Sequence, residues 1–222
     1  MRTARQSDTL SRWCSALLCL ALGTTFAWAA WRQTSGFEVW TFEGRRQLQA
    51  ASGQLQAPVV PLHLDDGSVA LAPWHTPGAT PAAYLVDFIY TRCPSVCRVL
   101  GNEYQQMQRQ LVERSRQDPA GQRIALLSVS FDTEHDQVQQ LQEAAMRLGA
   151  LPAHWRFAVP ASKTDAQSLL RALGVVAIAD GAGGFVHNGD IHLLDRDGRL
   201  RAMFGFDDWP RAMAAAKALA EP

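Results

Sequence analysis

The chain has 222 residues, and its 21 basic and 21 acidic side chains give a formal net charge of zero. No basic cluster is longer than Arg45-Arg46, so the charge pattern of a nucleic-acid-binding surface is missing and we expect no nucleic-acid partner. With 47% hydrophobic residues, the part after residue 35 is long enough to bury one core without disulfides or metal. A metal bound to this chain would therefore have a functional role, because the fold does not need it for stability.

The N-terminal segment is predicted to enter a membrane. Arg2, Arg5 and Arg12 precede the uncharged residues 13–31, which as one helix would reach roughly 28 Å, close to the thickness of the bilayer hydrocarbon. Residues 27–29 also have the small-x-small form of a signal-peptidase site, so residues 1–31 are either a retained signal-anchor or a signal peptide released after Ala29. The arginines place the following chain on the outer, periplasmic face of the cytoplasmic membrane.

The rest of the chain divides into a polar linker, 32–57, and a folded domain, 58–222. Two apolar runs around Asp66-Gly67 predict a β-hairpin over 59–71. Strand-like and helix-like patterns then alternate, and residues 185–194 and 199–206 are expected to form a second hairpin around the turn at 195–198. This order predicts an α/β, three-layer thioredoxin-like fold. The expected strands are 82–90, 123–131 and 154–159, and the expected helices are 94–113, 138–148, 162–173 and 209–220.

Cys93 and Cys97 lie where the first central strand meets its helix. Backbone N–H groups and the helix dipole favour the thiolate at such a position, and the thiolate is both the nucleophile and the soft-metal ligand. On one helix the pair would be separated by about 6 Å of rise, within reach of a disulfide or one shared metal. Burial as small hydrophobes is the plain alternative. A structural zinc site would need four ligands, and we find only three.

These residues carry a family resemblance. The segments YTRCPSVC, LLSVSFDTEHD and VHNGDIHLLDRDG resemble the Sco/SenC copper chaperones over most of residues 58–220. The resemblance implies that Cys93, Cys97 and His187 bind copper. It further implies delivery of copper, outside the membrane, to the dicopper centre of cytochrome c oxidase subunit II. Asp132 and Asp136 fall on the family's acidic positions after the second strand.

The sequence departs from the family pattern at three positions. Arg98 and Thr133 stand where the family usually has proline, and Val186 stands where it usually has the aspartate before the histidine. None of these changes removes a ligand. A metal-bound histidine usually donates its other N–H to a carboxylate or carbonyl, so without that aspartate another group must orient His187.

Two thiolates and one imidazole form a soft ligand set that suits Cu(I), and an added oxygen ligand would allow Cu(II). We expect His187 to lie on a loop after residues 181–184, from which it could approach and leave the metal. His192 is expected to be a surface or packing residue, and Asp132 to cap the helix that follows it. The remaining histidines, 63, 75, 135 and 154, have no cysteine or acidic partner set at ligand spacing.

A second hypothesis uses Cys93 and Cys97 as the redox pair of a thiol-disulfide oxidoreductase. Its substrate would be the cysteine pair of the oxidase subunit, and a thioredoxin-like protein could supply the reducing equivalents. His187 discriminates between the two hypotheses, because dithiol exchange needs only the cysteines. A peroxidase-like thiol enzyme is less favoured, because it requires one peroxidatic cysteine paired with an arginine.

Overall fold

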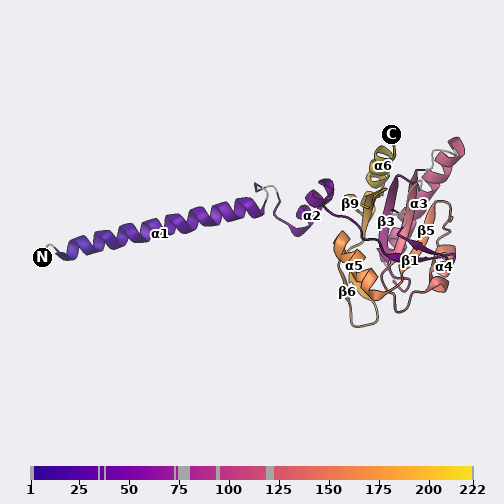
Figure 1. Cartoon of the computed structure of the whole chain (residues 1–222), viewed down its shortest axis with the longest axis horizontal. Helices are drawn as coiled ribbons and strands as arrows, with labels where there is room; N and C mark the ends of the chain where they lie inside the picture. The colour runs from indigo at the N-terminus through magenta and orange to yellow at the C-terminus, as the bar shows by residue number, and fades with distance from the viewer. Residues whose placement is uncertain are drawn as a thin grey trace. The chain divides into compact units, whose positions relative to one another are not determined.

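The structure is a computed structural model, and it describes residues 3–34, 36–37, 39–72, 74, 81–93, 96–118 and 123–221. Of residues 3–12, 42–43 and 96–99 only the backbone is described. The chain divides into two compact units, residues 1–46 and 47–222. Figure 1 shows the long N-terminal helix of the first unit and the α/β body of the second.

The first unit consists mainly of helix α1 (Thr3–Gln33). Its residues 13–33 form one stretch that is long and apolar enough to cross a membrane, judged by length and composition, and the described side chains there are largely exposed. The predicted membrane-entering helix is thus present as a candidate anchor. A second helix, α2 (Phe42–Ala51), follows and runs into the second unit. The division of the chain at residues 31 and 57 stays a prediction.

The second unit is built on a seven-stranded sheet in the order β2-β1-β5-β4-β3-β8-β9. Strands β3, β4 and β5 are parallel, whereas β1 and β8 pair antiparallel on the two sides of this central part. The predicted hairpins are present as β1 with β2 and β8 with β9, but the second begins at Asp190 and residues 185–187 belong to another sheet. The strands are β1 (Pro61–Leu64), β2 (Val69–Leu71), β3 (Ala83–Ile89), β4 (Ile124–Ser130), β5 (Trp155–Pro160), β8 (Asp190–Asp195) and β9 (Leu200–Gly205).

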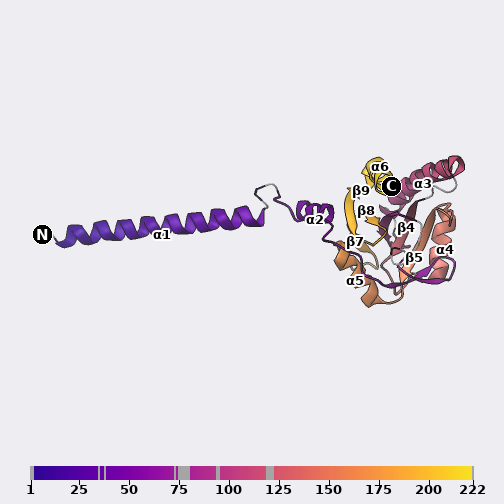
Figure 2. The ribbon, with the colours of Figure 1, turned by 45° about the horizontal axis from the view of Figure 1, so that its top comes forward.

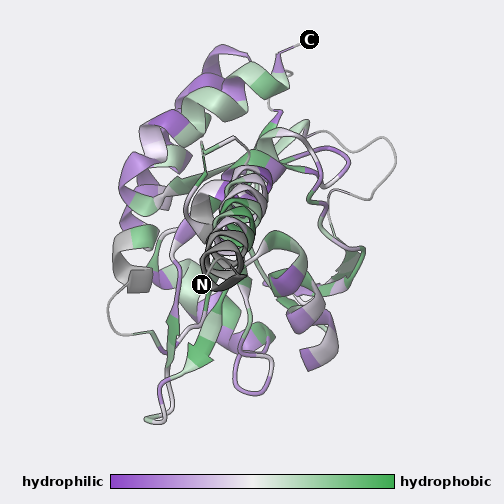
Figure 3. Cartoon of the chain, turned by 90° about the vertical axis from the view of Figure 1, so that its left-hand side faces the viewer, coloured by the Kyte–Doolittle hydropathy of each residue, from purple (hydrophilic) through white to green (hydrophobic). Residues whose placement is uncertain are grey.

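Helices cover both faces of the sheet, which confirms the three-layer thioredoxin-like architecture. One core cluster joins the sheet to α3 (Val96–Gln117), α4 (Val138–Arg147) and α6 (Trp209–Ala220). A second cluster lies under α5 (Lys163–Leu173) on the other face. Figure 2 shows α5 across the sheet from α3 and α6. These helices carry both hydrophilic and hydrophobic residues, as expected when one side packs on a sheet (Figure 3).

Helix ends follow local chemistry. Ser162 caps α5 by accepting a hydrogen bond from Asp165 N, and Gly174 ends it in the left-handed conformation with φ of 67°. Asp132 does not cap α4, contrary to the prediction, because the chain makes a turn through 132–136 and the N-cap is Gln137. A short 3-10 turn, η3 (Phe206–Asp208), precedes α6.

One element was not predicted. Strands β6 (Ala177–Ala179) and β7 (Phe185–His187) form a separate two-stranded sheet between α5 and β8. Asp180 orders the turn between them, because its Oδ1 accepts hydrogen bonds from Ala182 N and Gly184 N at 2.8 and 2.9 Å. The loop expected to hold His187 is therefore a β-hairpin, with His187 opposite Ala177.

Candidate metal centre

Cys93 lies at the carboxyl end of β3, in the turn that precedes α3. All seven residues of β3 are buried, so the strand fixes the start of this turn firmly in the core. Cys93 N donates to Tyr90 O at 3.1 Å, and the thiol is half-buried and free of a disulfide. Helix α3 is described from Val96 onward, and residues 94–95 lie outside the described residues. Cys93 itself is not helical, so the predicted four-residue helical spacing does not describe the pair. The Cys97 side chain lies outside the described residues.

A buried carboxylate holds the turn in front of Cys93. Asp136 is fully buried, and its oxygens accept from Thr91 N at 2.8 Å and from Thr91 Oγ1 at 2.6 Å. Ser130 Oγ donates to the same carboxylate at 2.6 Å. These three hydrogen bonds connect the ends of β3 and β4 and set the direction in which the chain enters the cysteine turn. Asp136 is therefore a positioning residue for Cys93.

The second acidic residue contacts the residue next to Cys93. Arg92 Nη2 lies 2.8 Å from Asp132 Oδ2, and His135 Nδ1 lies 3.0 Å from Asp132 Oδ1. Burial by itself would raise the pKa of Asp132, but hydrogen bonds from Arg92 and His135 outweigh it and lower the pKa. The carboxylate therefore stays charged and restrains Arg92 beside the cysteine.

His187 is directed inward from β7. Its ring packs edge-on against Tyr90 and Phe131, with ring centroids 6.0 and 5.2 Å apart. Nδ1 lies 3.1 Å from Asn188 O, a geometry in which Nδ1 donates its proton to that carbonyl. The Asn188 carbonyl thus takes the orienting role left open by the valine at 186.

The other ring nitrogen of His187 is then a lone-pair donor without a partner. Nε2 is buried and has no hydrogen bond to the part of the chain that the structure describes. Burial lowers the pKa of His187, partly offset by the Asn188 carbonyl and by Asp190, so the ring is neutral near pH 7. A neutral imidazole with a free, buried Nε2 is the form that binds a metal ion.

Cys93 and His187 line one cavity of about 510 Å³. Tyr90 and Arg92 form its wall on the β3 side, and the β6–β7 hairpin closes the other side. The structure therefore brings together two of the three predicted ligands. Among the side chains described, no three His, Cys, Asp or Glu residues gather at metal-ligand spacing. Whether Cys97 completes the set stays a prediction.

The histidines predicted not to bind metal lie elsewhere. His192 is fully buried on β8 and packs edge-on against Phe88 at 5.3 Å, which confirms a packing role. His135 contacts Asp132 and is half exposed, His63 lies on β1, and His154 is buried just before β5. His75 lies outside the described residues.

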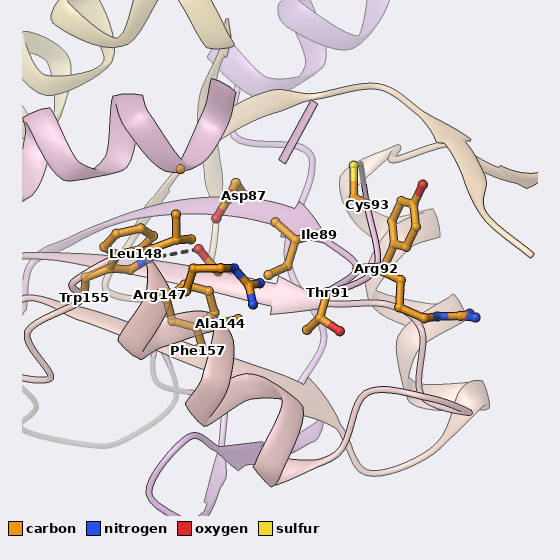
Figure 4. A pocket seen from close by; sticks show the side chains of 13 residues that line it. Asp87, Ile89, Thr91, Arg92, Cys93, Ala144, Arg147, Leu148, Trp155 and Phe157 are labelled. Carbon is orange, nitrogen blue, oxygen red and sulfur yellow. Dashed lines mark hydrogen bonds between the residues drawn. The ribbon is translucent and has the colours of Figure 1, made fainter. Parts of the chain in front are cut away.

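Cys93 also lines a second cavity. It has a volume of about 380 Å³ and runs between the sheet and helices α3 and α4 (Figure 4). Asp87 of β3 and Arg147 of α4 line it together with Cys93. Sequence reasoning missed Asp87, although a carboxyl in the middle of the apolar run AAYLVDFIY is a signal visible in the sequence.

Comparison with known proteins identifies the family. The SCO1/SenC family matches residues 79–220. The chain belongs to the SCO1/SenC family. No curated protein sequence matches the chain.

Solved Sco structures share this fold. Bradyrhizobium japonicum ScoI with copper bound is 20% identical, with a TM-score of 0.58 over 74% of this chain and 99% of that chain. Arabidopsis thaliana ScoI with copper bound is 17% identical, with a TM-score of 0.58 over 73% and 98%. BsSco, a Sco-family cytochrome c oxidase assembly protein with an identified disulfide switch, is 16% identical, with a TM-score of 0.61 over 75% and 94%.

Proposed function

We propose that this SCO1/SenC protein is a copper chaperone that delivers copper to the dicopper centre of cytochrome c oxidase subunit II or to another cuproprotein. The observation that carries the proposal is the cavity that Cys93 and His187 both line, together with a His187 Nε2 that is buried and has no hydrogen-bond partner among the described residues. Leaving such a nitrogen unsatisfied costs free energy, which a bound metal would offset.

The donor set decides which metal fits. Thiolates from Cys93 and Cys97 with the His187 imidazole make a soft, three-coordinate set that suits Cu(I), and one added oxygen ligand would allow Cu(II). Copper is the cargo here, so the site must release it as well as bind it. Binding displaces the thiol protons, and the start of α3 favours the resulting thiolates.

The relatives support the choice of copper and of client. The two ScoI proteins were solved with copper bound, and BsSco belongs to a family of cytochrome c oxidase assembly proteins. A thioredoxin-like reductant is a fitting second partner, because the cysteine pair must be reduced before it can bind copper.

We place the copper site on the outer face of the cytoplasmic membrane. The arginines at 2, 5 and 12 precede the apolar stretch of α1 and favour a cytoplasmic N-terminus. Helix α1 would then hold the second unit at the membrane where the oxidase is assembled, unless cleavage after Ala29 releases it.

The test is copper binding by the full-length chain in detergent, reduced under anaerobic conditions. We expect one copper per chain, lost or strongly weakened in Cys93→Ser, Cys97→Ser and His187→Ala. His63→Ala is the matched control, because it removes an imidazole on β1, far along the sheet from β3. Serine at positions 14 and 19 excludes binding by the exposed cysteines of α1. Tight copper binding that survives His187→Ala would contradict the proposed ligand set.

A second candidate function is thiol-disulfide exchange by Cys93 and Cys97. The position of the half-buried Cys93 thiol ahead of a helix favours it, since that position promotes a reactive thiolate. His187→Ala separates the two functions. It should abolish tight copper binding but leave the rate of exchange with a small disulfide nearly unchanged.

A further inference from the structure

Tyr90 contacts both parts of the chain that line the candidate copper site. It follows β3 directly, three residues before Cys93, and its backbone carbonyl accepts the hydrogen bond from Cys93 N. Its side chain is buried against the β6–β7 hairpin, with its ring centroid 5.3 Å from that of Phe185 and 6.0 Å from that of His187. Neither the fold nor the ligand set described above explains why this side chain carries a hydroxyl.

The hydroxyl of Tyr90 is bonded to the backbone of β7. Tyr90 Oη donates to Phe185 O at 3.3 Å, across 95 residues of sequence. Phe185 is the first residue of β7 and His187 is the last, so the bond holds the strand two residues away from the imidazole. A partly buried hydrogen bond of this length is modest in strength, so it can break and form again.

The β6–β7 hairpin depends on contacts of this kind. Its strands have three residues each, and a two-stranded sheet of that size is at best marginally stable by itself. Its outer side chains, Ile178 and Val186, are exposed. Its inner side chains, Phe185 and His187, both pack on Phe131 with ring centroids 5.2 Å apart. The contacts of the inner side therefore determine where the imidazole lies.

The hairpin leaves room for the hydroxyl at the residue before Phe185. A Cβ placed on Gly184 would lie 3.2 Å from Tyr90 Oη and 2.6 Å from Asp180 Oδ2. Gly184 does not have a positive φ, so close approach rather than backbone conformation requires glycine here. A larger residue would displace the hydroxyl from the Phe185 carbonyl or displace the carboxylate that orders the turn.

We propose that Tyr90 positions His187 for copper binding. Its hydroxyl fastens the β6–β7 hairpin to the end of β3, and the strength of this fastening sets the rate at which copper is released. The inference rests on the copper site proposed above and adds to it a residue outside the ligand set. Tyr90 is a positioning residue, because it acts on the metal through His187.

The effect of the hydroxyl on release follows from the place of His187 in the fold. The imidazole leaves the metal when β7 moves away from the end of β3, and this movement breaks the hydrogen bond from Tyr90 to Phe185. A phenylalanine at position 90 keeps the ring contacts and lacks that bond. The movement then becomes easier by the net contribution of one modest hydrogen bond, which corresponds to roughly three- to tenfold in rate.

The test compares Cu(I) release from wild type and Tyr90→Phe, both as full-length chains in detergent with serine at positions 14 and 19. Each reduced chain is loaded with one equivalent of Cu(I) without oxygen, and release is followed at chelator concentrations on which the rate no longer depends. We expect Tyr90→Phe to release copper roughly three- to tenfold faster. Tyr84→Phe is the matched control, because it removes the hydroxyl of a buried tyrosine near the other end of β3 and should keep the wild-type rate.

Two further measurements separate positioning of His187 from a general loss of structure. Thermolysin cleaves before large apolar residues such as Ile178 and Phe185. It should cut copper-free Tyr90→Phe within residues 177–187 roughly three- to tenfold faster than wild type, and elsewhere at the same rate. The rate of exchange with a small disulfide should not change, because the substitution keeps the carbonyl that accepts from Cys93 N.

Equal rates of copper release in wild type and Tyr90→Phe would overturn the inference. Faster release together with faster disulfide exchange would also overturn it, because the hydroxyl would then act through the cysteine turn. If Tyr90→Phe fails to fold, Gly184→Ala takes its place in the same measurements, since it crowds the same hydroxyl.

The thermolysin experiment separates this inference from the chaperone proposal. If the wild type binds no copper, the chaperone proposal fails. Unchanged cleavage within residues 177–187 would then overturn the inference as well, whereas faster cleavage there would support the fastening by Tyr90 and sink the chaperone proposal alone. Copper binding with unchanged release and unchanged cleavage sinks this inference alone.

Discussion

Replacing the buried carboxyl of β3 by an amide, Asp87→Asn, should make the stability of the second unit less dependent on pH. Burial raises the pKa of Asp87 from 3.8 to about 7. Each pKa difference of one corresponds to about 1.4 kcal/mol, so ionising this carboxyl in the folded state costs roughly 4 kcal/mol relative to the unfolded chain. Because the side chain is only 2% exposed, solvent screens this cost little.

The direction of the effect follows from the raised pKa. The folded state binds the proton more tightly than the unfolded state, so this contribution to stability is fully present below about pH 4. It is lost progressively as the pH rises through about 7. An asparagine does not titrate. The free energy of unfolding of wild type should therefore fall relative to Asp87→Asn by roughly 3 kcal/mol between about pH 5 and about pH 9.

Equilibrium unfolding in guanidinium chloride, followed by tryptophan fluorescence, measures this difference. Full-length wild type, Asp87→Asn and the exposed-site control Glu143→Gln would be compared at each pH, and the control should run parallel to wild type. If the difference in free energy of unfolding between wild type and Asp87→Asn stays constant across the pH range, Asp87 titrates as an ordinary, solvated carboxyl. The reasoning from burial would then be refuted.

Three further outcomes can be checked on the same preparation. Asp136→Ala should lower the free energy of unfolding by roughly 2–4 kcal/mol, measured by denaturation, because it removes the acceptor of the buried Ser130 hydroxyl and of the half-buried Thr91 N–H and hydroxyl. Gly198→Ala should lower the thermal midpoint more than Gly181→Ala. Both glycines have positive φ, but only at 198 would a Cβ overlap a buried tryptophan ring. Copper affinity, measured by competition with a chelator, should remain higher in wild type than in His187→Ala below pH 6.5. An exposed imidazole would be protonated there, but burial lowers the pKa of His187.

Each of these outcomes has a result that contradicts it. An Asp136→Ala protein as stable as wild type would mean that water replaces the carboxylate without loss. Equal thermal midpoints for the two glycine variants would mean that the tryptophan ring moves aside at no cost. If wild type and His187→Ala already bind copper equally well at or above pH 6.5, the imidazole is in contact with bulk solvent.

Much of the fold is readable from the sequence, because each element carries a local signal. Short apolar runs mark β3, β4 and β5. The Ser162 cap and Gly174 give the two ends of α5 to within one residue. The hairpins follow from Asp-Gly turns, whose glycines at 67 and 198 adopt positive φ. The β6–β7 hairpin escaped prediction because its strands have three residues each, too short for a periodic pattern.

The sequence allowed us to predict which residues form the candidate site better than how their side chains are arranged. Cys93 and His187 were found from sequence and line one cavity in the structure. The group that orients His187, the Asn188 carbonyl, could not be found, because every residue has such a carbonyl and only the backbone path selects one. Asp132 was misjudged as a helix cap, since its salt bridge to Arg92 depends on the pairing of β3 with β4.

The two-stranded sheet that carries His187 gives the proposed copper site unequal halves. Cys93 follows a strand buried along its whole length, whereas His187 ends a three-residue strand that, among the described residues, pairs with β6 alone. Amide protons in the first half should exchange with solvent only when the whole unit unfolds, and those in the second half through small local openings. Such openings would detach one copper ligand while the sheet stays intact, so the hairpin can set the lifetime of bound copper independently of the stability of the fold.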